Sequence, residues 1–109
     1  MIEIKVIMNS AVEEILSFKC CNLHGLNLEI HLTNPGPDPL TVHGHCELRG
    51  EKEDDRYGIE NLFPPGPYRL PPGEPLACYG SLADEVFGRY RWIVFRDLAG
   101  GEHRARLRG

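Results

Sequence analysis

Residues 26–48 read LNLEIHLTNPGPDPLTVHGHCEL, and this stretch decides the fold. Apolar and polar residues alternate on both sides of residues 34–39, a segment that contains three prolines. Alternation with period two predicts β-strands with one buried face, and proline lacks the backbone donor that a central strand needs. The stretch therefore predicts two strands, Leu26–Thr33 and Leu40–Leu48, separated by a turn.

The same pattern recurs along the rest of the chain. Pro/Gly clusters separate further predicted strands at residues 2–8, 75–82, 87–96 and 102–108. Short strands at this spacing are typical of a β-sandwich, and 109 residues match the usual size of one such domain. We therefore predict an all-β fold, a single antiparallel β-sandwich of about seven strands that spans residues 1–109.

Residues 10–19 fit two interpretations. Ser10 and Glu13 have the spacing of a helix capping box, and Val12, Ile15 and Leu16 would share one face of a short helix. Residues 15–20 also alternate with period two, which favours a strand. We prefer the strand, and the short helix remains an alternative.

The N-terminus and the cysteines are typical of a protein of the cytoplasm. Glu3 and Lys5 place charges in the first residues, and no apolar stretch there has the length of a signal peptide or membrane helix. These features predict a cytoplasmic protein that does not bind membranes. In a reducing compartment, four cysteines without a Cys-x-x-Cys pair are expected to be free structural thiols.

Three segments carry a resemblance to a known fold family. Residues 28–42 contain a strand, an Asn-x-Gly turn and a second strand; residues 70–74 contain a Pro-Gly-Glu turn; and residues 88–94 contain a Gly-x-Tyr strand. This order resembles the immunoglobulin-like adhesion-type modules of bacteria over about residues 28–109. The resemblance implies an immunoglobulin-like sandwich and says nothing about activity.

The same segments are similar to a second bacterial family, the intracellular proteinase inhibitors, which are single cytosolic domains of about this length. This similarity implies inhibition of an intracellular proteinase as an alternative function. The inserting element would be an exposed loop that proline makes rigid, such as Asn34–Pro39 or Phe63–Pro72.

Three histidines and a glutamate form a candidate metal site. If the strands at residues 26–33 and 40–48 pair as a hairpin, one register places His31 opposite His43 and Glu29 opposite His45. Zinc and copper accept such ligands. In many immunoglobulin-like sandwiches the corresponding strands belong to opposite sheets, and the histidines would then be separate surface residues, which is the interpretation we prefer.

Charge is distributed unevenly along the chain. Residues 1–66 hold eleven acidic and five basic residues, whereas residues 67–109 hold five acidic and seven basic residues. The seven basic residues of the second part are all arginine. A hairpin of the last two predicted strands that turns at Leu98-Ala99 would gather arginines and exposed apolar side chains on one face. Guanidiniums suit carboxylates or phosphates, and arginine with apolar neighbours is enriched at interfaces. The candidate partner-binding residues are Arg89, Arg91, Ile93, Phe95, Arg104, Arg106 and Arg108.

In that register the other face of the hairpin is predicted to be buried. Its residues are Tyr90, Trp92, Val94, Ala105 and Leu107.

We expect a non-enzymatic interaction module. The sequence shows no nucleophile beside a base and no phosphate-binding glycine loop, so neither catalysis nor a cofactor is expected. Nucleic acid is disfavoured because the net charge is −4 and aromatic residues are not interleaved with bases. The expected partner is another protein or a second copy of the chain, since an open sandwich has edge strands.

Overall fold

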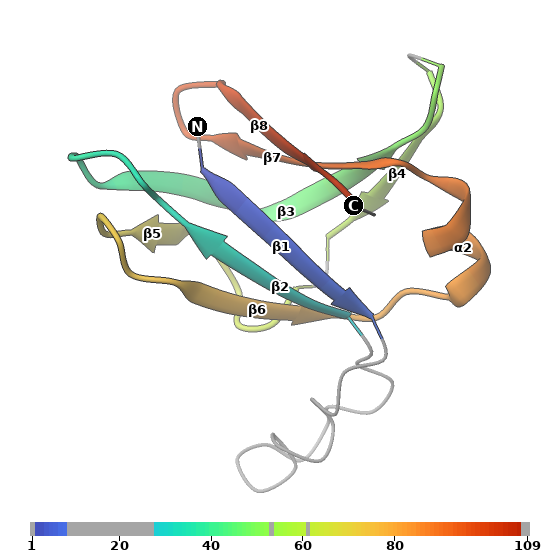
Figure 1. The fold of residues 1–109 in the computed structure, drawn as a ribbon, viewed down its shortest axis with the longest axis horizontal. Helices are drawn as coiled ribbons and strands as arrows, with labels where there is room; N and C mark the ends of the chain where they lie inside the picture. The colour runs from blue at the N-terminus through green and yellow to red at the C-terminus, as the bar shows by residue number, and fades with distance from the viewer. Residues whose placement is uncertain (1, 9–27, 53, 61, 108–109) are drawn as a thin grey trace, which may run out of the picture.

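Two antiparallel β-sheets stack face to face in the computed structural model, which describes residues 2–8, 28–52, 54–60 and 62–107 (Figure 1). The three-stranded sheet has the order β1–β2–β6. Its strands are β1 (Glu3–Met8), β2 (Leu28–Thr33) and β6 (Leu76–Gly80). The five-stranded sheet has the order β4–β3–β7–β8, and β5 also pairs with β3. Its strands are β3 (Leu40–Arg49), β4 (Arg56–Ile59), β5 (Tyr68–Leu70), β7 (Trp92–Asp97) and β8 (Glu102–Arg106).

The antiparallel sandwich that the sequence predicts is confirmed. The described residues form eight strands rather than about seven, because the sequence pattern does not predict β4 and β5. These strands have four and three residues, which is too short to show an alternating pattern. Residues 10–19, with their two interpretations, lie outside the described residues.

A short helix, α2 (Asp84–Arg89), replaces the first part of the strand predicted at residues 87–96. A basic residue in its last turn, Arg89, matches the helix dipole, and Val86 and Phe87 pack against the core. The predicted start of the strand is therefore wrong, and β7 begins at Trp92. Within the described ranges, no helix has the length and hydropathy to span a membrane.

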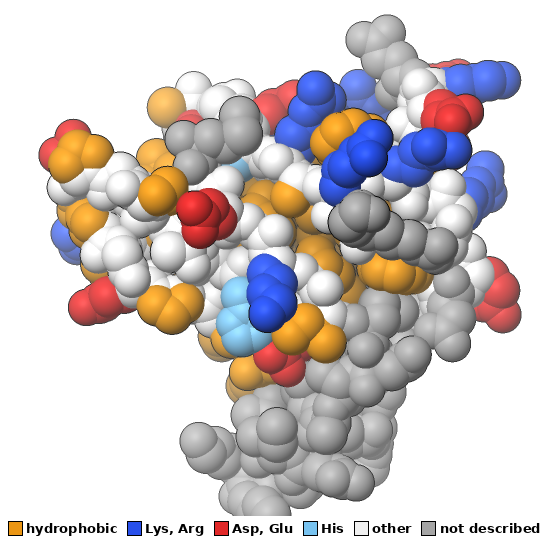
Figure 2. Space-filling model, viewed as in Figure 1, with side chains coloured by type: hydrophobic (Ala, Val, Ile, Leu, Met, Phe, Trp, Pro, Cys, Tyr) orange, Lys and Arg blue, Asp and Glu red, His pale blue; other side chains and the backbone are white. Residues whose placement is uncertain are grey.

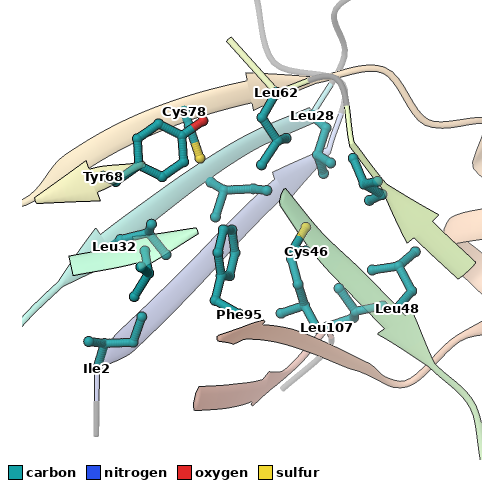
Figure 3. Packing of buried hydrophobic residues seen from close by; sticks show 14 of the residues in the cluster. Ile2, Leu28, Leu32, Cys46, Leu48, Leu62, Tyr68, Cys78, Phe95 and Leu107 are labelled. Atoms are coloured by element: carbon teal, nitrogen blue, oxygen red, sulfur yellow. The ribbon is translucent and has the colours of Figure 1, made fainter. Parts of the chain in front are cut away.

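The core fills the space between the two sheets, and Phe95 lies at its centre (Figure 3). Phe95 is fully buried, as are Leu32 of the three-stranded sheet and Leu48 of the five-stranded sheet. Burial of each such side chain stabilises the fold by about 2 kcal/mol relative to exposure. Cys46 and Cys78 are free and buried, as predicted for structural thiols, and burial raises the pKa of both.

Strands β2 and β3 lie in different sheets, which confirms the preferred interpretation and contradicts the hairpin on which the candidate metal site depends. β2 pairs with β1 and β6 instead. Each of the two strands is apolar along one face, and stacking them across the core buries both faces. Asn34 secures the connection between the sheets, since its side-chain amide donates to the carbonyl oxygens of Asp38 (2.6 Å) and Leu70 (3.1 Å).

Asp97 sets the register between β7 and β8. Its backbone N–H donates to the Gly101 carbonyl (2.9 Å), and its carboxylate accepts from the N–H groups of Ala99 (3.0 Å) and Gly101 (2.8 Å). The resulting register differs by one residue from the predicted one. A slip of one residue exchanges the inner and outer faces of a strand. Ile93 and Phe95 are consequently buried, and the prediction that they are exposed is wrong.

β3 contacts the loop before β5 through the backbone of two glycines. Gly44 lies where β3 bulges against β7, between Val42 and Cys46, and it faces Gly66. A Cβ on Gly44 would lie 2.5 Å from the Cα of Gly66. Non-bonded carbons approach to about 3.5 Å, so a side chain at this position requires the loop or the strand to move.

Candidate functional site

The outer face of the five-stranded sheet gathers charged side chains around Trp92. The register places Arg49, Trp92 and Arg106 in one row across β3, β7 and β8, and the next row contains Glu47, Val94 and Arg104. Figure 2 shows Lys and Arg side chains gathered where β8 ends and where β3 connects to β4. We call this surface the charged face. Its members are Glu47, Arg49, Trp92, Arg96, Glu102, Arg104 and Arg106.

One half of the charged face neutralises itself. Arg49 makes two hydrogen bonds to Glu102, with Nη1–Oε1 at 3.1 Å and Nη2–Oε2 at 2.6 Å, and it also pairs with Glu47. Arg96 lies 3.0 Å from the same Glu102 carboxylate. The hydrogen bonds from Arg49 and then Arg96 lower the pKa of Glu102 to about 2, and those to Glu102 and Glu47 raise the pKa of Arg49. The two glutamates and two arginines in this half of the charged face are therefore paired with one another.

Replacing Glu102 by glutamine should lower the urea midpoint of unfolding near neutral pH, because Arg49 and Arg96 lose their shared anion. The pKa of Glu102 is about 2 in the folded protein and 4.5 without its partners, so its contribution is present above the higher value. The contribution disappears as the pH falls through this window. The two midpoints should therefore converge near pH 2, and a constant separation from about pH 7 to about pH 2 would contradict this assignment.

The other half of the charged face keeps unneutralised charge. The guanidinium carbons of Arg104 and Arg106 lie 5.0 Å and 5.2 Å from the centre of the Trp92 ring, within the range of cation–π attraction. Both arginines are exposed, and no carboxylate within the described ranges forms an ion pair with either. As far as the described residues go, their N–H groups therefore remain available to an anion from outside.

The structure brings together only part of the predicted partner-binding set. Arg104 and Arg106 share the charged face, as predicted. Arg89 instead lies 3.5 Å from Asp55, and Arg91 lies 2.7 Å from Glu51 at the β3–β4 connection. Arg108 lies outside the described residues.

The sequence did not predict five members of the charged face, which are Glu47, Arg49, Trp92, Arg96 and Glu102, and it placed Trp92 on the wrong face. The predicted register places Trp92 and Val94 on the inner face, whereas both belong to the outer face. Trp92 is half-buried there, and Val94 is buried beneath the surrounding charged side chains. Residues 92–95 are all apolar, so the sequence of β7 does not show which face Trp92 occupies. The register between β7 and β8 decides it.

The predicted metal ligands do not come together. His31 contacts Glu29 on the three-stranded sheet, while His43 and His45 stack with ring centres 5.3 Å apart on the five-stranded sheet. Across the part of the chain that the structure describes, no group of three or more His, Cys, Asp or Glu side chains could hold a metal ion. The geometry gives no support to a metal site at Glu29, His31, His43 and His45.

His103 joins the two sheets at one edge. Its Nε2 lies 2.8 Å from the Asp97 carboxylate, and its Nδ1 accepts from the N–H of Ile2 at 3.2 Å. An imidazole whose Nδ1 accepts a hydrogen bond can donate from Nε2, here to the Asp97 carboxylate. The hydrogen bond from His103 lowers the pKa of Asp97. This buried pair fastens the start of β1 to the β7–β8 hairpin, which gives it a structural role.

No protein-family model, curated protein or solved structure matches this chain. The charged face can bind an anionic group, because a guanidinium presents a planar set of donors that fits a carboxylate with two hydrogen bonds. Tryptophan and arginine are also the residue types that contribute most to binding energy at protein interfaces.

Proposed function

We propose that this protein is a non-enzymatic interaction module that binds an acidic segment of another protein through the charged face. The observation that supports it is the pair of exposed guanidiniums, Arg104 and Arg106, that stack on Trp92 and have no acidic partner in the described residues. Their charge is directed outward in a chain whose net charge is −4. An anionic group on a partner would satisfy it.

Stacking on Trp92 favours binding by organising the two arginines in advance. A free arginine side chain loses rotamer entropy when it binds, at a cost of about 1 kcal/mol. Contact with the indole ring already restricts Arg104 and Arg106 before the partner arrives. The ring also excludes water from one side of each guanidinium, which strengthens a hydrogen bond to a carboxylate.

A protein partner fits the charged face better than nucleic acid does. Arg49 and Arg96 are already paired with Glu47 and Glu102, so the charged face offers a continuous row of phosphates little beyond Arg104 and Arg106. The chain also has a single tryptophan, whereas single-strand binders stack successive bases on several aromatic rings. Discrete carboxylates on a protein segment can contact Arg104 and Arg106 while avoiding the acids.

Titration with hexaglutamate should change the fluorescence of the protein, because Trp92 is its only tryptophan and lies at the centre of the charged face. The change should saturate, and it should weaken as salt rises from about 0.05 to about 0.5 M, since salt screens exposed charges. Hexalysine should produce no change at the same concentrations. Unchanged fluorescence at about 1 mM hexaglutamate in low salt would contradict the proposed function.

A further inference from the structure

β8 is an edge strand of the five-stranded sheet. Within the described ranges its one neighbour in the sheet is β7. Its outward side chains are Glu102, Arg104 and Arg106, so one side of the charged face ends at a strand edge. An edge strand offers unpaired backbone groups to another extended chain.

Hydrogen bonds at both ends of the β7–β8 pair define where the backbone of β8 points. Asp97 N–H donates to Gly101 at one end, and Leu107 N–H donates to Arg91 at the other, each at 2.9 Å. Hydrogen-bonded pairs alternate with non-hydrogen-bonded pairs in an antiparallel ladder. The odd-numbered residues of β8 therefore bond to β7, and the even-numbered ones direct their N–H and C=O groups to the open edge. These residues are Glu102, Arg104 and Arg106.

The same three residues thus offer charged side chains together with backbone groups that have no backbone partner among the described residues. We propose that the acidic partner binds as an extended antiparallel strand that adds to β8, with acids opposite Arg104 and Arg106 and a base opposite Glu102. This inference rests on the proposed function and specifies the form of the partner. Such strand addition obtains affinity from main-chain hydrogen bonds and specificity from alternate side chains.

Charge determines which strand fits the edge. A second copy of β8 that paired antiparallel about its centre would place Arg104 opposite Arg104, and like charges directly opposite each other destabilise a sheet. An acidic strand places opposite charges at both arginines instead. Its remaining side chains would lie beside His103 and Ala105, which point toward the core, so small apolar or β-branched residues suit those positions.

The matching peptide is Glu-Val-Glu-Thr-Lys, blocked at both ends, which places its acids opposite Arg106 and Arg104. Methylation of the backbone nitrogens of its two glutamates should weaken binding about tenfold, because those N–H groups face β8. The matched control carries the methyl groups on valine and threonine, whose N–H groups face away, and should bind within about threefold of the parent. Glu-Glu-Val-Thr-Lys should bind less tightly than the parent, because its adjacent acids point to opposite faces.

The Kd of each peptide can be measured through Trp92 fluorescence. The inference is overturned, and the proposed function kept, if all four peptides bind equally and the Arg104→Glu/Arg106→Glu variant binds none of them. Both are overturned if neither these peptides nor hexaglutamate binds. Strand addition is supported if two peptides alone lose affinity: the one methylated on its glutamates, and Glu-Glu-Val-Thr-Lys.

Discussion

Replacing Gly44 by alanine is expected to lower the free energy of unfolding by about 3 kcal/mol. The added Cβ would lie 2.5 Å from both the Cα and the nitrogen of Gly66, and a rigid backbone cannot move aside as a flexible side chain can. β3 or the loop before β5 must therefore shift, although β3 pairs with β4, β5 and β7. Urea denaturation followed by circular dichroism measures the change.

The matched control is Gly58→Ala on the neighbouring strand β4. No atom beyond its chain neighbours lies within 4 Å of a Cβ at Gly58, and its φ is not positive, so alanine fits without strain. This variant should unfold at the same urea concentration as the wild type or gain about 0.5 kcal/mol, because alanine restricts the unfolded chain. Equal stability of the two alanine variants would show that Gly44 and Gly66 do not make the close contact.

Alternation in the sequence predicts which faces of the strands are buried but not which strands are neighbours. Residues 28–33 and 40–49 show clear alternation, and both strands lie close to their predicted positions. Periodicity within a strand carries no information on its partner, however. The hypothesis of a metal site at His31 and His43 depended on that partner, and the two strands belong to different sheets.

The register of the last hairpin could not be predicted because β7 is apolar on both faces at its centre. Every residue from Trp92 to Phe95 is apolar, so either alternating set could face the core. The register is set at Asp97. Its carboxylate accepts a hydrogen bond from the N–H of Gly101, and its own N–H donates to the Gly101 carbonyl, which closes the turn. Because this is a side-chain interaction within a loop, hydrophobic periodicity does not reveal it.

The candidate site was consequently predicted in part. Arg104 and Arg106 were predicted to share an outer face, and they do, because the charged residues of β8 alternate with His103 and Ala105. Trp92, which organises them, was assigned to the wrong face by the slip of one residue. Arg89 was placed on a strand, but it ends a six-residue helix, which is too short to show a helical period.

Reversing two charges on β8 should abolish binding of acidic segments. In the variant Arg104→Glu/Arg106→Glu, two carboxylates replace the guanidiniums that contact Trp92 and repel an acidic partner. Both side chains are exposed and lack ion pairs in the described residues, so the fold should be retained. The affinity for hexaglutamate should fall by more than about tenfold.

The control variant is Lys5→Glu/Arg69→Glu, which changes the net charge by the same amount at exposed positions on β1 and β5. Calorimetric titration of hexaglutamate into wild type and both variants, at about 0.15 M salt, tests the role of the charged face most directly. We predict that the β8 variant loses binding while the control remains within about threefold of the wild type. An equal loss in both variants, or unchanged affinity in the β8 variant, would contradict binding through Arg104 and Arg106.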